Sequence, residues 1–118
     1  MIKELKSLHT NTLVYDLEDF ITKYEIEIIE TGIEARLQDF DKINLMICIN
    51  VKKENLGAFI KEFQLSIKYW NKIYKIAYVA DKKNWKIIVE IDNLFTKIKE
   101  KYFDIDDIAK AWDWISND

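Results

Sequence analysis

The chain has 118 residues, and its 18 Lys and Arg against 21 Asp and Glu give a formal net charge of -3 at pH 7. This length favours one domain over residues 1–118, and a hydrophobic content of 49% is enough to form a core. Net acidity opposes contact with a phosphate backbone, so nucleic acid is not an expected partner.

The residue types that most catalytic and cofactor sites need are scarce. The chain contains two Gly, no Pro, one Cys and one His. Two separated glycines cannot build a phosphate-binding loop or a dinucleotide fingerprint. One Cys and one His cannot supply the usual zinc ligands, nor can one Cys form an internal disulfide. We therefore expect no cofactor, no metal and no enzymatic activity.

The hydrophobicity pattern predicts neither a membrane span nor a signal peptide. No apolar stretch approaches the roughly 20 residues that a membrane-spanning helix requires. Residues 1–6 alternate apolar and charged side chains, which is unlike the apolar core of a signal peptide. A cytoplasmic location is expected.

The first third of the chain predicts a hairpin followed by a helix. Strands are expected at 2–8 and 12–17, and the polar segment 9–11 between them suits a turn. Thr22 and Glu25 have the spacing of a capping box, which marks the start of a helix. Apolar residues then recur every three or four positions, as expected of a helix that packs against a sheet.

The middle of the chain alternates between predicted strands and helices. Residues 43–49 form a dense apolar run, which is typical of a central parallel strand covered on both faces. A helix with aromatic residues on one stripe is expected at 56–70, a strand at 74–80, and a further helix at 84–95. This alternation indicates an α/β layer fold.

The C-terminal segment predicts one more strand and one more helix. The strand at 98–103 has lysines at alternating positions, a pattern that protects an exposed sheet edge. Asp104 or Asp106 is expected to cap the last helix, which contacts the sheet through Ile108 and Ile115 among others. The expected fold is a single α/β domain with an antiparallel hairpin, then βα units, and about five strands and four helices.

Two local sequences carry a family resemblance. Residues 58–85 combine an aromatic helix, a strand that ends in Asp81 and a helix that contains Trp85, and residues 101–115 form a closing strand and a helix with a tryptophan near its end. This arrangement resembles the SpoIIAA-like family of the STAS superfamily. The resemblance implies a binding or regulatory domain. Through the similar shape of CRAL-TRIO lipid carriers, it also implies a pocket for a small apolar molecule.

The resemblance also implies where a regulatory phosphate would be. Classical STAS regulators switch partners through a phosphorylated Ser at the start of the helix after the central strand. The matching segment here, 50–56, contains no Ser or Thr. A serine phospho-switch is therefore not expected in this chain.

Two groups of residues are candidates for a ligand site. Aromatic side chains could line an apolar pocket between helices, although their helix-core spacing favours ordinary core packing. These aromatic candidates are Phe59, Phe63, Trp70 and Trp85. Ligands of open α/β sheets gather at the carboxyl edge of the strands, and the expected polar rim there is Lys53, Asn55, Asp81 and Asn84. Asp81 could instead simply cap the next helix.

Three single residues complete the candidates. Trp114 is displaced by about 200 degrees from the stripe of Trp112 at helical pitch, so we predict that it contacts a second subunit or a partner. His9 is expected to be a solvated turn residue rather than a general base. Cys48 lies in the central apolar run and is expected to be a small buried side chain.

Two functions are consistent with these patterns. The first is a non-enzymatic domain that acts through protein contacts, as a homodimer and with an unknown protein partner. The alternative is a carrier or sensor of a small apolar molecule held between the aromatic helices.

Overall fold

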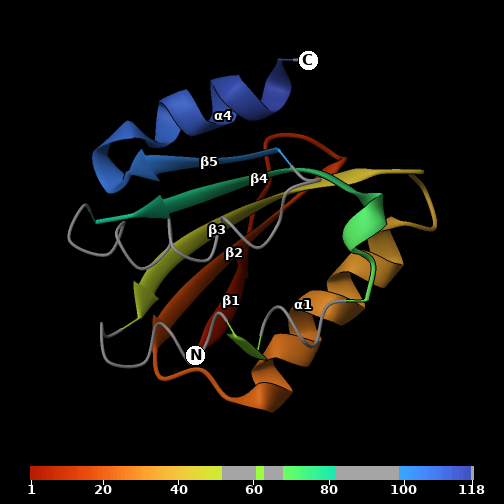
Figure 1. Ribbon diagram of the computed structural model, residues 1–118, viewed down its shortest axis with the longest axis horizontal. Coiled ribbons are helices and arrows are strands. Elements are labelled where there is room, and N and C mark those ends of the chain that lie inside the picture. The colour runs from red at the N-terminus through yellow and green to blue at the C-terminus, as the bar shows by residue number, and fades with distance from the viewer. Residues whose placement is uncertain (52–60, 63–67, 82–98, 118) are drawn as a thin grey trace.

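The computed structural model describes residues 1–51, 61–62, 68–81 and 99–117. Within these ranges the chain forms a five-stranded sheet in the order β1-β2-β3-β4-β5. The strands are β1 (Ile2–Leu5), β2 (Thr12–Asp19), β3 (Ile43–Val51), β4 (Ile73–Ala80) and β5 (Lys99–Asp104). β1 is antiparallel to β2 and every later pair is parallel, so β2 to β5 point the same way (Figure 1).

Four helical segments have bounds in the described part: α1 (Lys23–Arg36), α4 (Ile108–Ser116) and the 3-10 turns η1 (Trp70–Lys72) and η3 (Ile105–Asp107). The two α-helices confirm the first and last of the four predicted helices. The other two predictions, at 56–70 and 84–95, fall mainly outside the described residues. Lys68 and Tyr69 are not helical and Trp70 opens the 3-10 turn η1, so the prediction is wrong for residues 68–70.

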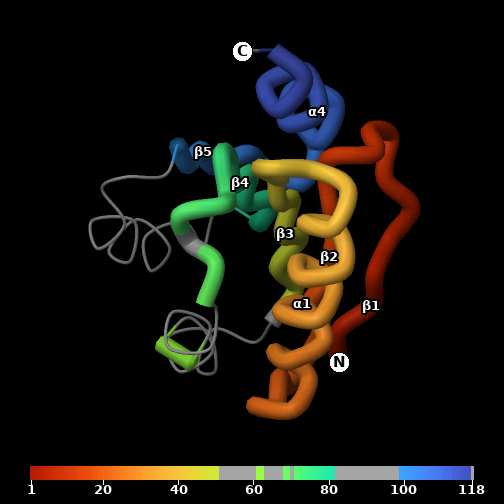
Figure 2. Tube along the Cα trace, turned by 90° about the vertical axis from the view of Figure 1, so that its right-hand side faces the viewer, coloured from red at the N-terminus to blue at the C-terminus, as the bar shows by residue number. Residues whose placement is uncertain are grey.

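The sheet separates two packed layers. α1 covers one face and α4 the other, as the two views of the chain show (Figures 1 and 2). β3 lies at the centre of the sheet and β5 at its edge, which confirms both predictions. Alternate residues of β3 pack to opposite sides: Leu45 and Ile47 join the cluster under α1, and Met46 joins the cluster under α4.

The start of α1 confirms the capping box. The Glu25 backbone N–H donates to Thr22 Oγ1 at 3.2 Å, and the Thr22 backbone N–H donates to Glu25 Oε1 at 3.1 Å. Glu25 Oε2 also accepts from the backbone N–H of Ile2 at 3.0 Å, which joins β1 to the helix. Partial burial raises the pKa of Glu25, but the hydrogen bonds from Thr22 and the amino group of Met1 outweigh it and lower the pKa.

Two predicted details are wrong at the ends of elements. β1 stops at Leu5 rather than residue 8, because the Ser7 hydroxyl donates to His9 O at 2.6 Å and accepts from His9 N–H at 3.2 Å. A side chain that bonds the nearby backbone in this way competes with the strand ladder. Asp104 caps η3 rather than α4, and Ile108 is exposed, so α4 packs through Ala111 and Ile115.

No helix in the described ranges has both the length and the apolar character needed to cross a bilayer.

Gly32 allows α1 to approach β2 closely. A Cβ atom at this position would lie 1.9 Å from Tyr15 Oη, and Tyr15 is buried, with 1% of its surface exposed. The phenol ring therefore has no space into which it could turn. The contact sets the distance between α1 and the sheet.

We predict that Gly32→Ala lowers the free energy of unfolding by about 2 kcal/mol, the usual cost of overpacking a core. In a Tyr15→Phe background the clashing oxygen is gone, so the same change should cost almost nothing, because alanine favours a helix over glycine by about 1 kcal/mol. Urea unfolding of the four proteins measures both effects. An equal cost of Gly32→Ala in the two backgrounds would contradict the close contact.

Candidate functional site

A bulge near the start of β4 changes which side chains face α4. Ile73 pairs with Ile43, but the next pair along is Asn44 with Lys75, so Tyr74 is an extra residue on β4. Ile73 and Ile76 both belong to the cluster under α1. The two residues between them, Tyr74 and Lys75, are therefore both available to the α4 side.

Lys75 binds the C-terminal end of α4. Its side chain is buried, with 3% of the residue exposed, and Nζ donates to Trp114 O at 2.7 Å and also to Asn117 O. The ammonium group lies 5.0 Å from the centre of the Trp114 ring, a cation–π contact. The last carbonyls of a helix carry the negative end of its dipole, so a buried cation is stabilised there.

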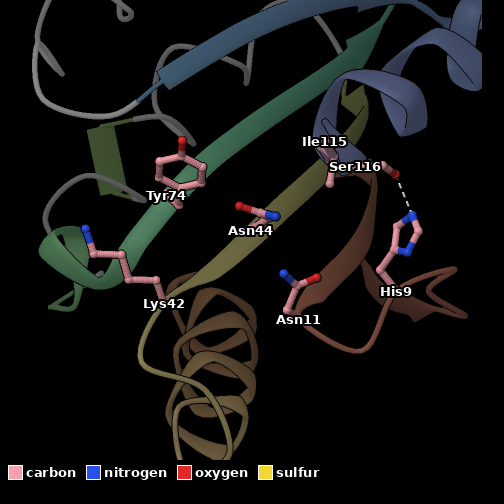
Figure 3. Close-up of a pocket in the computed structure, with 7 residues that line it drawn as sticks. All are labelled: His9, Asn11, Lys42, Asn44, Tyr74, Ile115 and Ser116. Carbon is pink, nitrogen blue, oxygen red and sulfur yellow. Dashed lines mark hydrogen bonds between the residues drawn. The ribbon is translucent and has the colours of Figure 1, made fainter. Parts of the chain in front are cut away.

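α4 runs back across the sheet from the end of β5, so its last turn lies over the starts of the parallel strands (Figure 1). A cavity of about 450 Å³ lies at this amino edge. Asn11 and Asn44 lie between its two ends, one of which is formed by Lys42 and Tyr74 (Figure 3). The opposite end is formed by His9 together with Ile115 and Ser116 of α4.

Asn44 is the most deeply buried polar residue of the cavity lining, with 5% of its surface exposed. Its Oδ1 is buried and has no hydrogen-bond partner. The neighbouring Asn11 accepts from Thr12 Oγ1 at 3.1 Å and, through its backbone oxygen, from Asn44 N–H at 2.9 Å. The strand pairing thus places two carboxamides side by side.

His9 and Ser116 join the β1–β2 turn to α4. Ser116 Oγ lies 2.7 Å from Trp112 O and 2.6 Å from His9 Nε2. A carbonyl oxygen only accepts, so the single hydroxyl proton goes to Trp112 and His9 Nε2 donates to Ser116. The His9 ring also meets the Trp112 ring edge-on, with centroids 5.7 Å apart. His9 is exposed, as predicted, but the sequence did not predict this contact with α4.

Most of the predicted site residues lie outside the described part of the chain. These are Phe59, Phe63, Trp85, Lys53, Asn55 and Asn84. The backbone of Trp70 lies in η1. Asp81 follows β4 at the carboxyl edge and is exposed, so the cavity described above is at the opposite edge of the sheet. The predicted apolar pocket and polar rim stay predictions.

Trp114 and Cys48 are both described. Trp114 is half-buried against the cluster under α4, and its ring lies 6.0 Å from the Phe103 ring. Its predicted contact with a second subunit stays a prediction. Cys48 is buried, as expected, and burial, with the nearby Asp16 carboxylate, raises its pKa to about 11. At neutral pH it is a thiol, which is a poor nucleophile.

Sequence reasoning missed Asn44 and Lys75, although each left a signal. Both are polar residues inside stretches that are otherwise almost wholly apolar, residues 43–49 of β3 and residues 73–80 of β4. A polar side chain at such a position must find a hydrogen-bond partner or a ligand.

The fold is that of a small α/β domain with a mixed sheet, and its best-defined site is a polar cavity. The profile of the SpoIIAA-like family matches residues 12–116, so the chain belongs to the SpoIIAA-like family. A comparison with curated proteins found no match, and neither did a comparison with solved structures. Family membership supports a binding or regulatory role.

We predict that Lys75→Met lowers the free energy of unfolding by about 2 kcal/mol, because the carbonyls at the end of α4 lose a charged donor. Lys72→Met is the matched control, since Lys72 is exposed on η1, and it should change stability by less than about 0.5 kcal/mol. Urea unfolding followed by tryptophan fluorescence measures both. Equal effects of the two substitutions would contradict the role of Lys75.

Proposed function

We propose that this SpoIIAA-like domain is a non-enzymatic binding module that acts through protein contacts made by the outer side of α1. The observation that carries the proposal is a row of exposed apolar side chains. Phe20, Tyr24 and Ile28 are 64%, 80% and 49% exposed. Tyr24 and Ile28 are four residues apart on α1 and so are neighbours on one side of the helix, while Phe20 lies just before the helix N-cap Thr22. Exposed apolar side chains gathered in this way are typical of protein interaction sites.

The first partner that this row fits is a second copy of the chain. A twofold axis across α1 would bring the two rows together, because the same patch serves both subunits of such a dimer. Lys23 and Glu27, both exposed on α1, have opposite charges. In an antiparallel pairing of the two helices, Lys23 of each copy would face Glu27 of the other.

The α1 row supports a protein contact better than Trp114 does. Trp114 already packs against Phe103 and holds the Lys75 ammonium group in its own chain. The row on α1, in contrast, is directed away from the core. The buried Cys48 thiol also supports a role without nucleophilic chemistry. Contacts through α1 require no phosphorylated serine.

The apolar-carrier alternative depends on Phe59, Phe63 and Trp85, which lie outside the described residues. The cavity that the structure does describe is lined mainly by polar side chains. A lipid-like molecule would leave those groups without partners. The carrier function therefore stays a prediction of the sequence, and the protein-contact function is the one we adopt.

We predict that the protein dimerises and that Ile28→Glu weakens the dimer by about tenfold or more, since a carboxylate would be buried in an apolar contact. Sedimentation equilibrium over a concentration series measures the dissociation constant. Ile108→Glu is the control, because Ile108 is 42% exposed and lies on α4.

Ile108→Glu should leave the dimer unchanged, and both variants should unfold at urea concentrations close to that of the unmodified protein. A protein that stays monomeric at every concentration would contradict the proposal. A dimer that tolerates Ile28→Glu would contradict the use of α1.

A further inference from the structure

The cavity at the amino edge of the sheet has features of a ligand site that are separate from the α1 surface. Asn44 provides the first. Oδ1 of this side chain is buried without a hydrogen-bond partner, and 5% of the residue is exposed. A buried carboxamide oxygen without a partner is costly. A ligand that donates a hydrogen bond would supply the missing partner.

The charge of the cavity lining is the second feature. Its ionisable side chains are Lys42, His9 and Tyr74, and the described lining contains no carboxylate. Lys99 adds a further positive charge at the same end, where Nζ donates to Tyr74 Oη at 2.9 Å and lies 4.8 Å from the centre of the ring. An anion is therefore favoured at the end formed by Lys42 and Tyr74.

The carbonyl groups at the end of α4 would normally oppose an anion nearby. Here Lys75 donates to two of them, Trp114 O and Asn117 O. The buried ammonium group thus offsets the negative end of the helix dipole beside the cavity. The bulge at Tyr74 makes this possible, because it brings Lys75 to the α4 side while Tyr74 forms part of the wall.

The third feature is size and shape. A volume of about 450 Å³ lies within the range of small-molecule sites, roughly 300–1,000 Å³. The ring of Tyr74 and the side chain of Ile115 are apolar surfaces on opposite sides of Asn44 (Figure 3). A molecule that fits must have one anionic group, one hydrogen-bond donor and a short apolar part.

We infer that this cavity binds a small organic carboxylate that carries a hydroxyl or amino group beside the carboxylate. The carboxylate lies at the end formed by Lys42 and Tyr74, the donor group bonds Oδ1 of Asn44, and the apolar part contacts Ile115 at the opposite end. The site lies on the α4 side of the sheet. Its occupation does not depend on dimerisation through α1.

The test uses two probes that differ by one hydroxyl group, 3-phenyllactate and 3-phenylpropionate. Isothermal titration calorimetry measures the affinity of each for the unmodified protein. We expect phenyllactate to bind about five- to tenfold more tightly, the usual value of one hydrogen bond to a buried group. In amide NMR spectra, phenyllactate should shift the signals of Asn11 and Asn44.

Two variants assign the contacts. Asn44→Ala should reduce phenyllactate affinity to that of phenylpropionate, and Lys42→Gln should weaken both probes about equally, by roughly two- to fivefold for one exposed ion pair. Lys42 is exposed, so that variant folds whether or not Asn44→Ala does. Lys3→Gln, at an exposed position of β1, is the control for overall charge and should change neither affinity.

Three results would overturn the inference. Neither probe binds at millimolar concentration, both bind with affinities that Asn44→Ala and Lys42→Gln leave unchanged, or the hydroxyl group makes no difference in the unmodified protein. Inorganic phosphate is titrated as a third probe. If phosphate binds more tightly than phenyllactate and depends on Lys42 alone, the site is a simple anion site and the proposed ligand class is wrong.

Discussion

A buried ammonium group must find partners inside the protein, and this requirement determines where α4 lies. Lys75 is on a central strand, and water cannot solvate its charge there. The carbonyls at the end of a helix are suitable partners because no backbone N–H of the helix donates a hydrogen bond to them. α4 is therefore held with its last turn over the start of β4. This position of the helix also determines where Trp114 and Ile115 lie.

The cavity is a consequence of this arrangement. Parallel sheets usually present their ligand sites at the carboxyl ends of the strands. Here α4 returns over the amino ends, and the bulge at Tyr74 directs a large ring to the same side (Figures 1 and 3). The contact between His9 and Ser116 joins the β1–β2 turn to the wall. The α1 row and the cavity lie on opposite faces of the sheet, so the two surfaces can be occupied at once.

The sequence predicted those features that depend on local patterns. The capping box of Thr22 and Glu25, the buried central strand and the edge position of β5 all follow from spacing and hydrophobicity. The bulge could not be predicted, because no glycine or proline marks it and the pairing of Asn44 with Lys75 joins strands far apart in the sequence. The cavity at the amino edge depends on that bulge and on the return of α4.

The central claim is that α4 packs over the amino edge of the sheet in the free protein, with no ligand or partner bound. Nuclear Overhauser effects between aromatic side chains test this directly in solution. The account predicts cross-peaks between the His9 and Trp112 rings and between the Phe103 and Trp114 rings, whose centroids lie 5.7 Å and 6.0 Å apart. Absence of both cross-peaks, with α4 amides that exchange as fast as those of an unfolded chain, would contradict it.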